Sequence, residues 1–241
     1  MRGKKTPYRK LINIARYKMS LSHDPIHDVS HVKRVVRLVR VLAAECDLSK
    51  SQTDALVLAA WWHDVSRTLT KRPSIVIMPF FDDIISALML WRETVRQGVF
   101  GDVVGMATRM IACKSLGTGK ILTKLLLNKK NRIMVDILFD ADMLDAINIA
   151  RTKSIHLLAE NSRSYQLGYK LSIWWFLSRE RLYVKTDEAQ KYLLLVLDEF
   201  LAWMKEQDIY DWHVKYFGKK WVLKQFEKSE LFMEDLSHAY S

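Results

Sequence analysis

Residues that break helices or crosslink small folds are scarce in this sequence. The 241 residues include only 8 glycines, 4 prolines and 2 cysteines. So little glycine and proline argues against a turn-rich β sandwich and favours helices. Cys46 and Cys113 lie in apolar stretches of helical pattern, where a free thiol packs like a small hydrophobic side chain. A chain of this length can fold without disulfides or a structural metal, so we expect any metal that it binds to serve chemistry.

Long hydrophobic runs are absent as well. The longest apolar runs, such as 55–62, fall well short of the roughly 20 residues that a membrane helix needs. Near the basic N-terminus, Arg16 and Lys18 interrupt the segment in which a secretory signal would carry its apolar core. We therefore predict a soluble protein of the reducing cytoplasm with no membrane partner.

Acidic residues are fewer than basic ones. The chain has 27 Asp and Glu residues and 38 Lys and Arg residues, which gives a formal net charge of +11. A surface of this sign attracts anions, but nucleotides, nucleic acids, acidic lipids and acidic proteins all qualify. Charge alone therefore does not select a function.

Apolar residues recur with the period of a helix along almost the whole chain. Residues 29–46 place them at steps of three and four, which is the stripe of an amphipathic helix. Ser51 and Asp54 have the spacing of a capping box ahead of the next helix. Tyr183 and Val184 could form a short strand, but no alternating pattern of useful length exists. The sequence thus predicts an all-α fold, with helices over 29–46, 55–66, 80–96, 103–113, 132–148, 150–161, 166–178, 186–206 and 219–235.

Neither an internal repeat nor a linker rich in Pro, Gly or Ser divides the chain. We therefore expect a single helical domain, although the composition becomes more aromatic and basic near residue 162. The predicted organisation is a core over 1–160 and a C-terminal helical elaboration over 161–241 that packs on this core.

Histidines and aspartates form the pattern that carries chemistry. His31 lies on the apolar face of its helix, and His63 follows an apolar run with Asp64 directly after it. A lone histidine in such a place is usually a core residue bonded to a carbonyl, but a buried carboxylate beside it must be paired or bind a metal. Imidazole and carboxylate donors from separate helices suit a divalent transition metal. A further carboxylate is available from segment 135–146, which contains four aspartates.

Three sequence blocks in this order resemble the HD-domain superfamily of metal-dependent phosphohydrolases. The first block, 27–35, reads His-Asp-Val-Ser-His-Val-Lys-Arg-Val and is similar to the opening of a small bacterial branch. The second block, 58–67, resembles the apolar helix that delivers the His-Asp pair of the family, here His63 and Asp64. The third block, 140–146, reads Asp-Ala-Asp-Met-Leu-Asp-Ala and resembles the run that ends the family's core. The resemblance covers roughly residues 20–160 and implies the helical bundle of an HD domain.

The resemblance implies a centre for one divalent metal, which would be Mn, Fe, Ni or Zn. A second metal would need further histidine ligands between the His-Asp pair and the last aspartate, and the sequence has none there. Pattern alone leaves Asp140 and Asp142 open as the last ligand, because they lie about 200° apart around a helix and cannot both face one metal. The family pattern favours Asp142. The implied ligands are therefore His31, His63, Asp64 and Asp142.

The resemblance also implies how the substrate is held and attacked. Asp64 would accept a proton from a metal-activated water, and Arg67 follows Asp64 by one helical turn. Arg34 follows His31 by one turn, and guanidinium groups so placed could bind a phosphate. We predict Asp64 and Arg67 as catalytic residues, and we predict that the substrate is bound by His27, Arg34, Lys114 and Arg151. Arg67 and Thr68 stand where some relatives carry an acidic residue, so the general acid of those relatives does not transfer.

We therefore predict a metal-dependent phosphohydrolase that acts on a nucleotide or a similar small phosphorylated substrate. The alternative is a catalytically weak HD-type module that senses nucleotides or binds nucleic acid, because segment 210–226 interleaves aromatic and basic residues. Segment 117–120 lacks the spacing of a phosphate-binding loop. The aromatic cluster 174–176 is expected to pack, and it could form the interface of a homo-oligomer.

Overall fold

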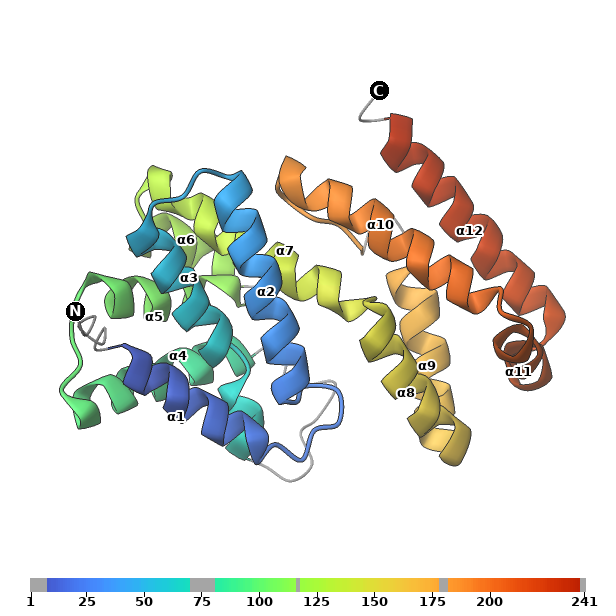
Figure 1. Ribbon diagram of the computed structural model, residues 1–241, viewed down its shortest axis with the longest axis horizontal. Coiled ribbons are helices and arrows are strands. Elements are labelled where there is room, and N and C mark those ends of the chain that lie inside the picture. The colour runs from blue at the N-terminus through green and yellow to red at the C-terminus, as the bar shows by residue number, and fades with distance from the viewer. Residues whose placement is uncertain (1–7, 70–80, 116–117, 178–181, 239–241) are drawn as a thin grey trace, which may run out of the picture. The chain divides into compact units, whose positions relative to one another are not determined.

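The apolar run 55–62 forms a buried part of a helix. The computed structural model describes residues 8–69, 81–115, 118–177 and 182–238, and every regular element in these ranges is a helix (Figure 1). Tyr183 and Val184 lie in a segment without regular structure. The prediction of an all-α fold is therefore confirmed. None of the described helices combines the length and the apolar character that crossing a membrane requires.

The helices group into two units, residues 1–141 and 142–241. The division falls within one helix, α7 (Arg132–Ala146). Besides α7 as far as Ala141, the first unit contains α1 (Arg9–Ser20), α2 (Val29–Glu45), α3 (Lys50–Trp62), η1 (Val65–Leu69), α4 (Asp82–Gln97), α5 (Asp102–Lys114), α6 (Gly119–Leu126) and η3 (Lys129–Asn131).

α3 is the central helix of the first unit. It packs against α1, α2 and α5, and every side chain over 55–62 is buried. A helix stretch with no polar face must be surrounded on all sides. This packing places the end of α3, where His63 and Asp64 follow, inside the unit.

The start and the end of α3 differ from the sequence prediction. The capping box is formed by Ser49 and Gln52, not by Ser51 and Asp54, so the helix begins at Lys50. The Ser49 side chain accepts a hydrogen bond from the Gln52 amide at 3.4 Å, and the Gln52 side chain accepts one from the Ser49 amide at 3.0 Å. The helix also ends at Trp62 rather than near residue 66, and the chain turns at His63 before η1 begins. His63 and Asp64 therefore lie just beyond the end of α3.

The second unit continues from α7. Its other helices are α8 (Ile149–Asn161), α9 (Arg163–Phe176), α10 (Asp187–Met204), α11 (Gln207–Phe217) and α12 (Lys219–His238). α8 packs against α9, and α10 contacts α8, α11 and α12. The sequence prediction missed the three short helices α1, α6 and α11. The composition shift near 162 falls between α8 and α9, and the domain limits 1–160 and 161–241 stay a prediction.

A histidine is buried among aromatic rings in the second unit. His213 is fully buried, and its Nδ1 donates a hydrogen bond to the Ile209 carbonyl at 2.6 Å. Its Nε2 therefore accepts from the Tyr169 hydroxyl, 2.9 Å away. Burial lowers the pKa of His213 to about 4; the nearby His156 adds to this decrease, and the hydrogen bond to Ile209 opposes it. His213 is thus a neutral core residue at neutral pH.

We expect the second unit to lose stability in mild acid because of His213. Above the ordinary pKa of 6.5, the ring is neutral in both the folded and the unfolded chain. As the pH falls from there to about 4, the unfolded chain takes up a proton that the folded chain does not, so the free energy of unfolding decreases. The decrease amounts to up to about 3 kcal/mol. Thermal unfolding followed by circular dichroism between pH 7 and about pH 4.5 measures it.

The matched variants for this prediction are His213→Gln and His23→Gln. Gln can still accept from Tyr169 but does not titrate, so His213→Gln should flatten the decrease in unfolding temperature. His23 is exposed, so His23→Gln should leave the decrease as in the parent chain. An equally steep decrease in His213→Gln would assign the acid sensitivity to other groups.

Candidate metal centre

α2 and its cap place His31 in the interior. The Asp28 side chain caps α2 by accepting hydrogen bonds from the backbone amides of Ser30 and His31, both at 2.9 Å. The apolar stripe of α2 faces the core, and His31 lies on this stripe with no exposed surface. The sequence prediction that the His31 imidazole points inward is therefore confirmed.

His63 is held in the orientation that a metal ligand needs. The residue is fully buried, and its Nδ1 donates to the Ala60 carbonyl at 2.8 Å. A carbonyl can only accept, so the proton of the neutral ring is on Nδ1 and the lone pair is on Nε2. This Nε2 lies 3.3 Å from Nε2 of His31. Histidine ligands commonly donate their other ring N–H to a backbone carbonyl in this way.

Asp64 brings a carboxylate oxygen to the two imidazoles. Its Oδ2 lies 3.1 Å from Nε2 of His31 and 3.4 Å from Nε2 of His63. Within the described part of the chain, this buried oxygen makes no hydrogen bond. Burial raises the pKa of Asp64, but the imidazoles of His63, His31 and His27 lower it by more, so the pKa lies well below its usual value. An ionised, buried carboxylate oxygen thus faces two imidazole nitrogens.

Asp142 forms a group of possible ligands with the same two histidines. Among the described residues, one atom each of His31, His63 and Asp142 lie within 4.8 Å of one another. Asp142 is carried by α7 and directly follows Ala141, the last residue of the first unit. Asp140 of the same helix is fully buried. Of the two aspartates that the sequence pattern left open, it is therefore Asp142 that belongs to a group able to bind a metal.

The distances fit one small cation. Nitrogen and oxygen ligands that lie 2.0–2.2 Å from one ion at tetrahedral or octahedral angles are about 3.0–3.5 Å apart. The three separations among His31, His63 and Asp64 are 3.1, 3.3 and 3.4 Å. The lone pair of His63 and the charge of Asp64 would repel each other at this distance without a proton or a cation between them. The donor set, two imidazoles with carboxylates, suits the divalent transition metals.

Arg67 is surrounded by three carboxylates. Its guanidinium lies 2.7 Å from Oδ2 of Asp82, 3.3 Å from Oδ2 of Asp24 and 3.8 Å from Oδ1 of Asp64. Burial raises the pKa of Asp82 to about 6; Arg67 opposes this increase, and the charges of Asp64 and Asp83 add to it. Hydrogen bonds and charge from His27 hold the pKa of Asp24 below its usual value in spite of burial. A buried network of charges thus extends from Asp64.

The other predicted binding residues lie in different surroundings. His27 is close to the centre, with its ring centroid 5.5 Å from that of His31 and its Nδ1 3.0 Å from Oδ2 of Asp24. Arg34 is half-buried, and its charge contributes to lowering the pKa of Asp28.

Lys114 and Arg151 each contact an aspartate. Lys114 lies 3.5 Å from Asp83 in the first unit. Arg151 lies 3.6 Å from the buried Asp145 in the second. Both cations are therefore already close to a negative charge.

Asp24, Asp82 and Asp83 are the residues that the sequence analysis missed. All three are buried. Asp24 belongs to the segment His23-Asp-Pro-Ile-His27. Its position three residues before His27 was the one sign in the sequence that it could lie near the site. Asp82 and Asp83 open α4, where acidic residues usually lie on the surface and favour the helix dipole, so their pattern gave no sign of burial.

Comparison of the chain with protein-family models, with curated proteins and with solved structures found no significant match. The case for a metal centre therefore rests on the residues and their geometry. Membership of the HD-domain superfamily stays a prediction from the three sequence blocks.

Proposed function

We propose that the protein is a metal-dependent phosphohydrolase that acts on a nucleotide or a similar small phosphorylated molecule. The observation that carries the proposal is the buried convergence of His31, His63 and Asp64, with His63 oriented by the Ala60 carbonyl. Asp142 joins the two histidines in the order of ligands that the HD-domain resemblance implies. This resemblance supplies the class of reaction.

The proposal gives each residue of the centre a task. His31, His63, Asp64 and Asp142 would hold one divalent ion. When bound, such an ion lowers the pKa of a water molecule and neutralises charge on a phosphate. Asp64, which is ionised, would accept the proton that the water loses as it attacks phosphorus.

Arg67 is proposed as a positioning residue. Its guanidinium faces Oδ1 of Asp64, whereas the two imidazoles face Oδ2. The Asp64 carboxylate therefore lies between the Arg67 guanidinium and the two imidazoles. Because Arg67 also contacts Asp24 and Asp82, its charge is already engaged, which favours positioning over direct contact with a phosphate.

Arg34 and His27 are the proposed contacts to the phosphate. Arg34 follows His31 by three positions, so the two side chains leave α2 on neighbouring parts of its surface. A guanidinium can donate two parallel hydrogen bonds to a phosphate. His27 lies beside His31 and is less buried than His31, His63 and Asp64. Lys114 and Arg151 stay predictions as further contacts.

The nucleic-acid alternative depends on the aromatic and basic segment 210–226. In the described structure, Trp212 and Phe217 make ring contacts with Tyr169, and Phe217 contacts Trp221. Rings that already pack on one another offer less surface on which bases can stack. This packing favours the phosphohydrolase over the alternative.

Metal analysis of the purified protein tests the proposal. We expect about one equivalent of Mn, Fe, Ni or Zn per chain, because Asp142 groups with His31 and His63, and Asp64 also faces these two histidines. His31→Ala should lower the metal content by at least tenfold. The exposed His23 provides the matched control, and His23→Ala should retain the metal.

The same preparations are then screened for hydrolysis of nucleotides and of simple phosphoesters, with each of the four metals added. Turnover that requires the metal and is lost in His31→Ala supports the proposal. A protein that binds none of these metals and hydrolyses nothing, but binds nucleic acid tightly, contradicts it.

A further inference from the structure

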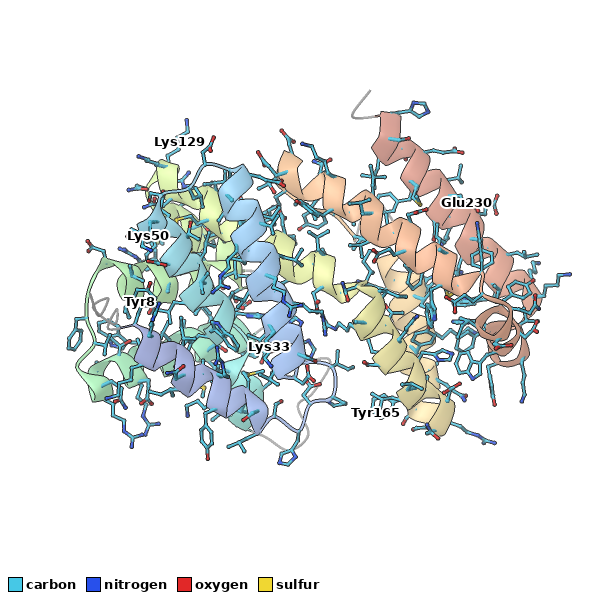
Figure 2. All side chains as sticks on the ribbon, viewed as in Figure 1. Tyr8, Lys33, Lys50, Lys129, Tyr165 and Glu230 are labelled. Atoms are coloured by element: carbon cyan, nitrogen blue, oxygen red, sulfur yellow. The ribbon has the colours of Figure 1, made fainter. Side chains whose placement is uncertain are left out.

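A basic groove lies on the first unit between α1 and α2, with one residue of α3 in its lining. It has a volume of about 500 Å³. We call it the α1–α2 groove. Its lining consists of Arg9, Ile12, Asn13, Arg16, Lys33, Val36, Arg37, Arg40 and Trp61. Figure 2 labels Lys33 on α2. No carboxylate is among the described residues that line the groove.

Two rows of side chains at helical spacing face this groove. From α1 come residues 9, 12, 13 and 16, and from α2 come residues 33, 36, 37 and 40. Both rows have the spacing i, i+3, i+4, i+7, which is one face of a helix. The periodicity of each helix therefore sets its row of cations on a single face.

α1 is fixed so that its row borders the groove. Leu11, Ala15 and Met19 form a buried stripe along α1. The indole of Trp62 in α3 donates a hydrogen bond to the Leu11 carbonyl at 3.1 Å. These contacts set the rotation of α1 about its axis. The groove is thus a consequence of packing in the first unit.

The five cations of the groove have no acidic partner in the described part of the chain. Arg9, Arg37 and Arg40 are exposed, as are Lys33 and Arg16, and none forms an ion pair with a described residue. The Arg16 guanidinium lies over the Trp61 ring, 5.1 Å from its centre. Five like charges around one concavity produce a positive potential that a bound anion would neutralise.

The groove is separate from the candidate metal centre. Lys33 follows His31 by two positions, so the two side chains leave α2 about 200° apart. His31 points into the core, whereas Lys33, Arg37 and Arg40 are exposed. A ligand of the groove is therefore not the substrate bound beside His31.

We propose that the α1–α2 groove is a second anion site, and that its ligand is a small molecule with two or more linked phosphate groups. The first and last residues of each row are seven positions apart, or about 10 Å along the helix, so the positive charge is distributed along the groove and not concentrated at one point. Arg and Lys side chains donate hydrogen bonds and accept none, which suits the oxygens of phosphates. The volume lies within the range of about 300–1,000 Å³ that is usual for small-molecule sites.

The observations favour a small ligand over a nucleic-acid strand. Proteins that bind single strands usually offer aromatic faces on which bases stack. The aromatic residue here, Trp61, is only 4% exposed and lies beneath the guanidinium of Arg16. The groove therefore recognises phosphate charge without offering a surface for a base.

Calorimetric titration of the metal-free full chain with inorganic tripolyphosphate tests this inference. We expect tripolyphosphate to bind to one site per chain at least about tenfold more tightly than orthophosphate. ATP in a parallel titration distinguishes the sources of the phosphates: equal binding points to the phosphate chain alone, and tighter binding points to a nucleotide. A chain that does not bind tripolyphosphate, or that binds a short oligonucleotide in preference to it, overturns the proposal.

Matched charge variants locate the site. Arg37→Gln/Arg40→Gln removes two cations from the groove and should weaken binding by at least about tenfold. Arg92→Gln/Arg96→Gln removes two exposed arginines from α4 and should leave the affinity unchanged. His63→Ala removes a proposed metal ligand and should bind tripolyphosphate as tightly as the parent chain does. The test of the groove is therefore independent of the proposed hydrolase function. Equal losses in the two double variants would mean nonspecific attraction and overturn the proposal.

Discussion

We expect Asp64→Asn to reduce the proposed phosphohydrolase activity by at least about a thousandfold while the chain stays folded. The amide has the shape of the carboxylate, but it carries no charge to bind a cation and cannot accept a proton as readily. Asp64 Oδ2 lies 3.1 and 3.4 Å from the two histidine nitrogens, so the substitution acts at the centre of the site. The measurement is the turnover of the substrate found in the screen, together with the metal content of the same sample.

The control is Asp54→Asn, at a half-buried position in the same helix that leads to Asp64. It makes the same chemical change, and we expect it to leave turnover within about twofold of the parent value. Loss of both metal and turnover in Asp64→Asn would identify Asp64 chiefly as a ligand. Retention of the metal with loss of turnover would identify it chiefly as the proton acceptor. Turnover close to that of the parent chain would contradict both tasks.

Arg67→Met is expected to lower the free energy of unfolding by about 3–5 kcal/mol, the largest effect on stability among these predictions. Methionine fills part of the same space but leaves Asp24, Asp64 and Asp82 without the cation that neutralises them. A buried charge that loses its partner retains the cost of its removal from water. Urea denaturation followed by circular dichroism measures the change.

Two further variants test the cause of this loss. Arg92→Met makes the same exchange at an exposed position of α4 and should change stability by less than about 0.5 kcal/mol. Adding Asp82→Asn to Arg67→Met should restore part of the stability, because one of the uncompensated charges is removed. If Arg67→Met proves as stable as the parent chain, the carboxylates around Arg67 are balanced by something other than its charge.

The inward direction of the site residues could be predicted from the sequence because it depends on local periodicity. His31 shares a helix face with valines and a leucine, and His63 follows an unbroken apolar run, so both were expected in the interior and both are fully buried. The start of α3 was placed a few residues too late, because Ser49 and Ser51 both lie near it and the sequence did not show that Ser49 is the cap. The helices α1, α6 and α11 were missed although each carries an apolar face at helical spacing, so the signal for them was available in the sequence.

The charge network around Arg67 could not be predicted in the same way. Its acidic partners Asp24 and Asp82 are far from Arg67 in the sequence and come from other elements. Nothing in their own segments distinguishes a buried aspartate from a surface one. Only the packing of α4 and of the segment before α2 against η1 decides that these side chains meet.

The scarcity of glycine and proline and the helical periodicity determined by themselves that this protein is all-α, and the excess of basic residues determined its positive net charge. Local sequence sets which face of a helix is apolar, because neighbours three and four positions apart share a face. Tertiary structure alone decided which faces meet. It placed Asp142 with His31 and His63, and it set the cations of α1 opposite those of α2. Such contacts join residues far apart in the chain, and their formation depends on how the helices pack as a whole.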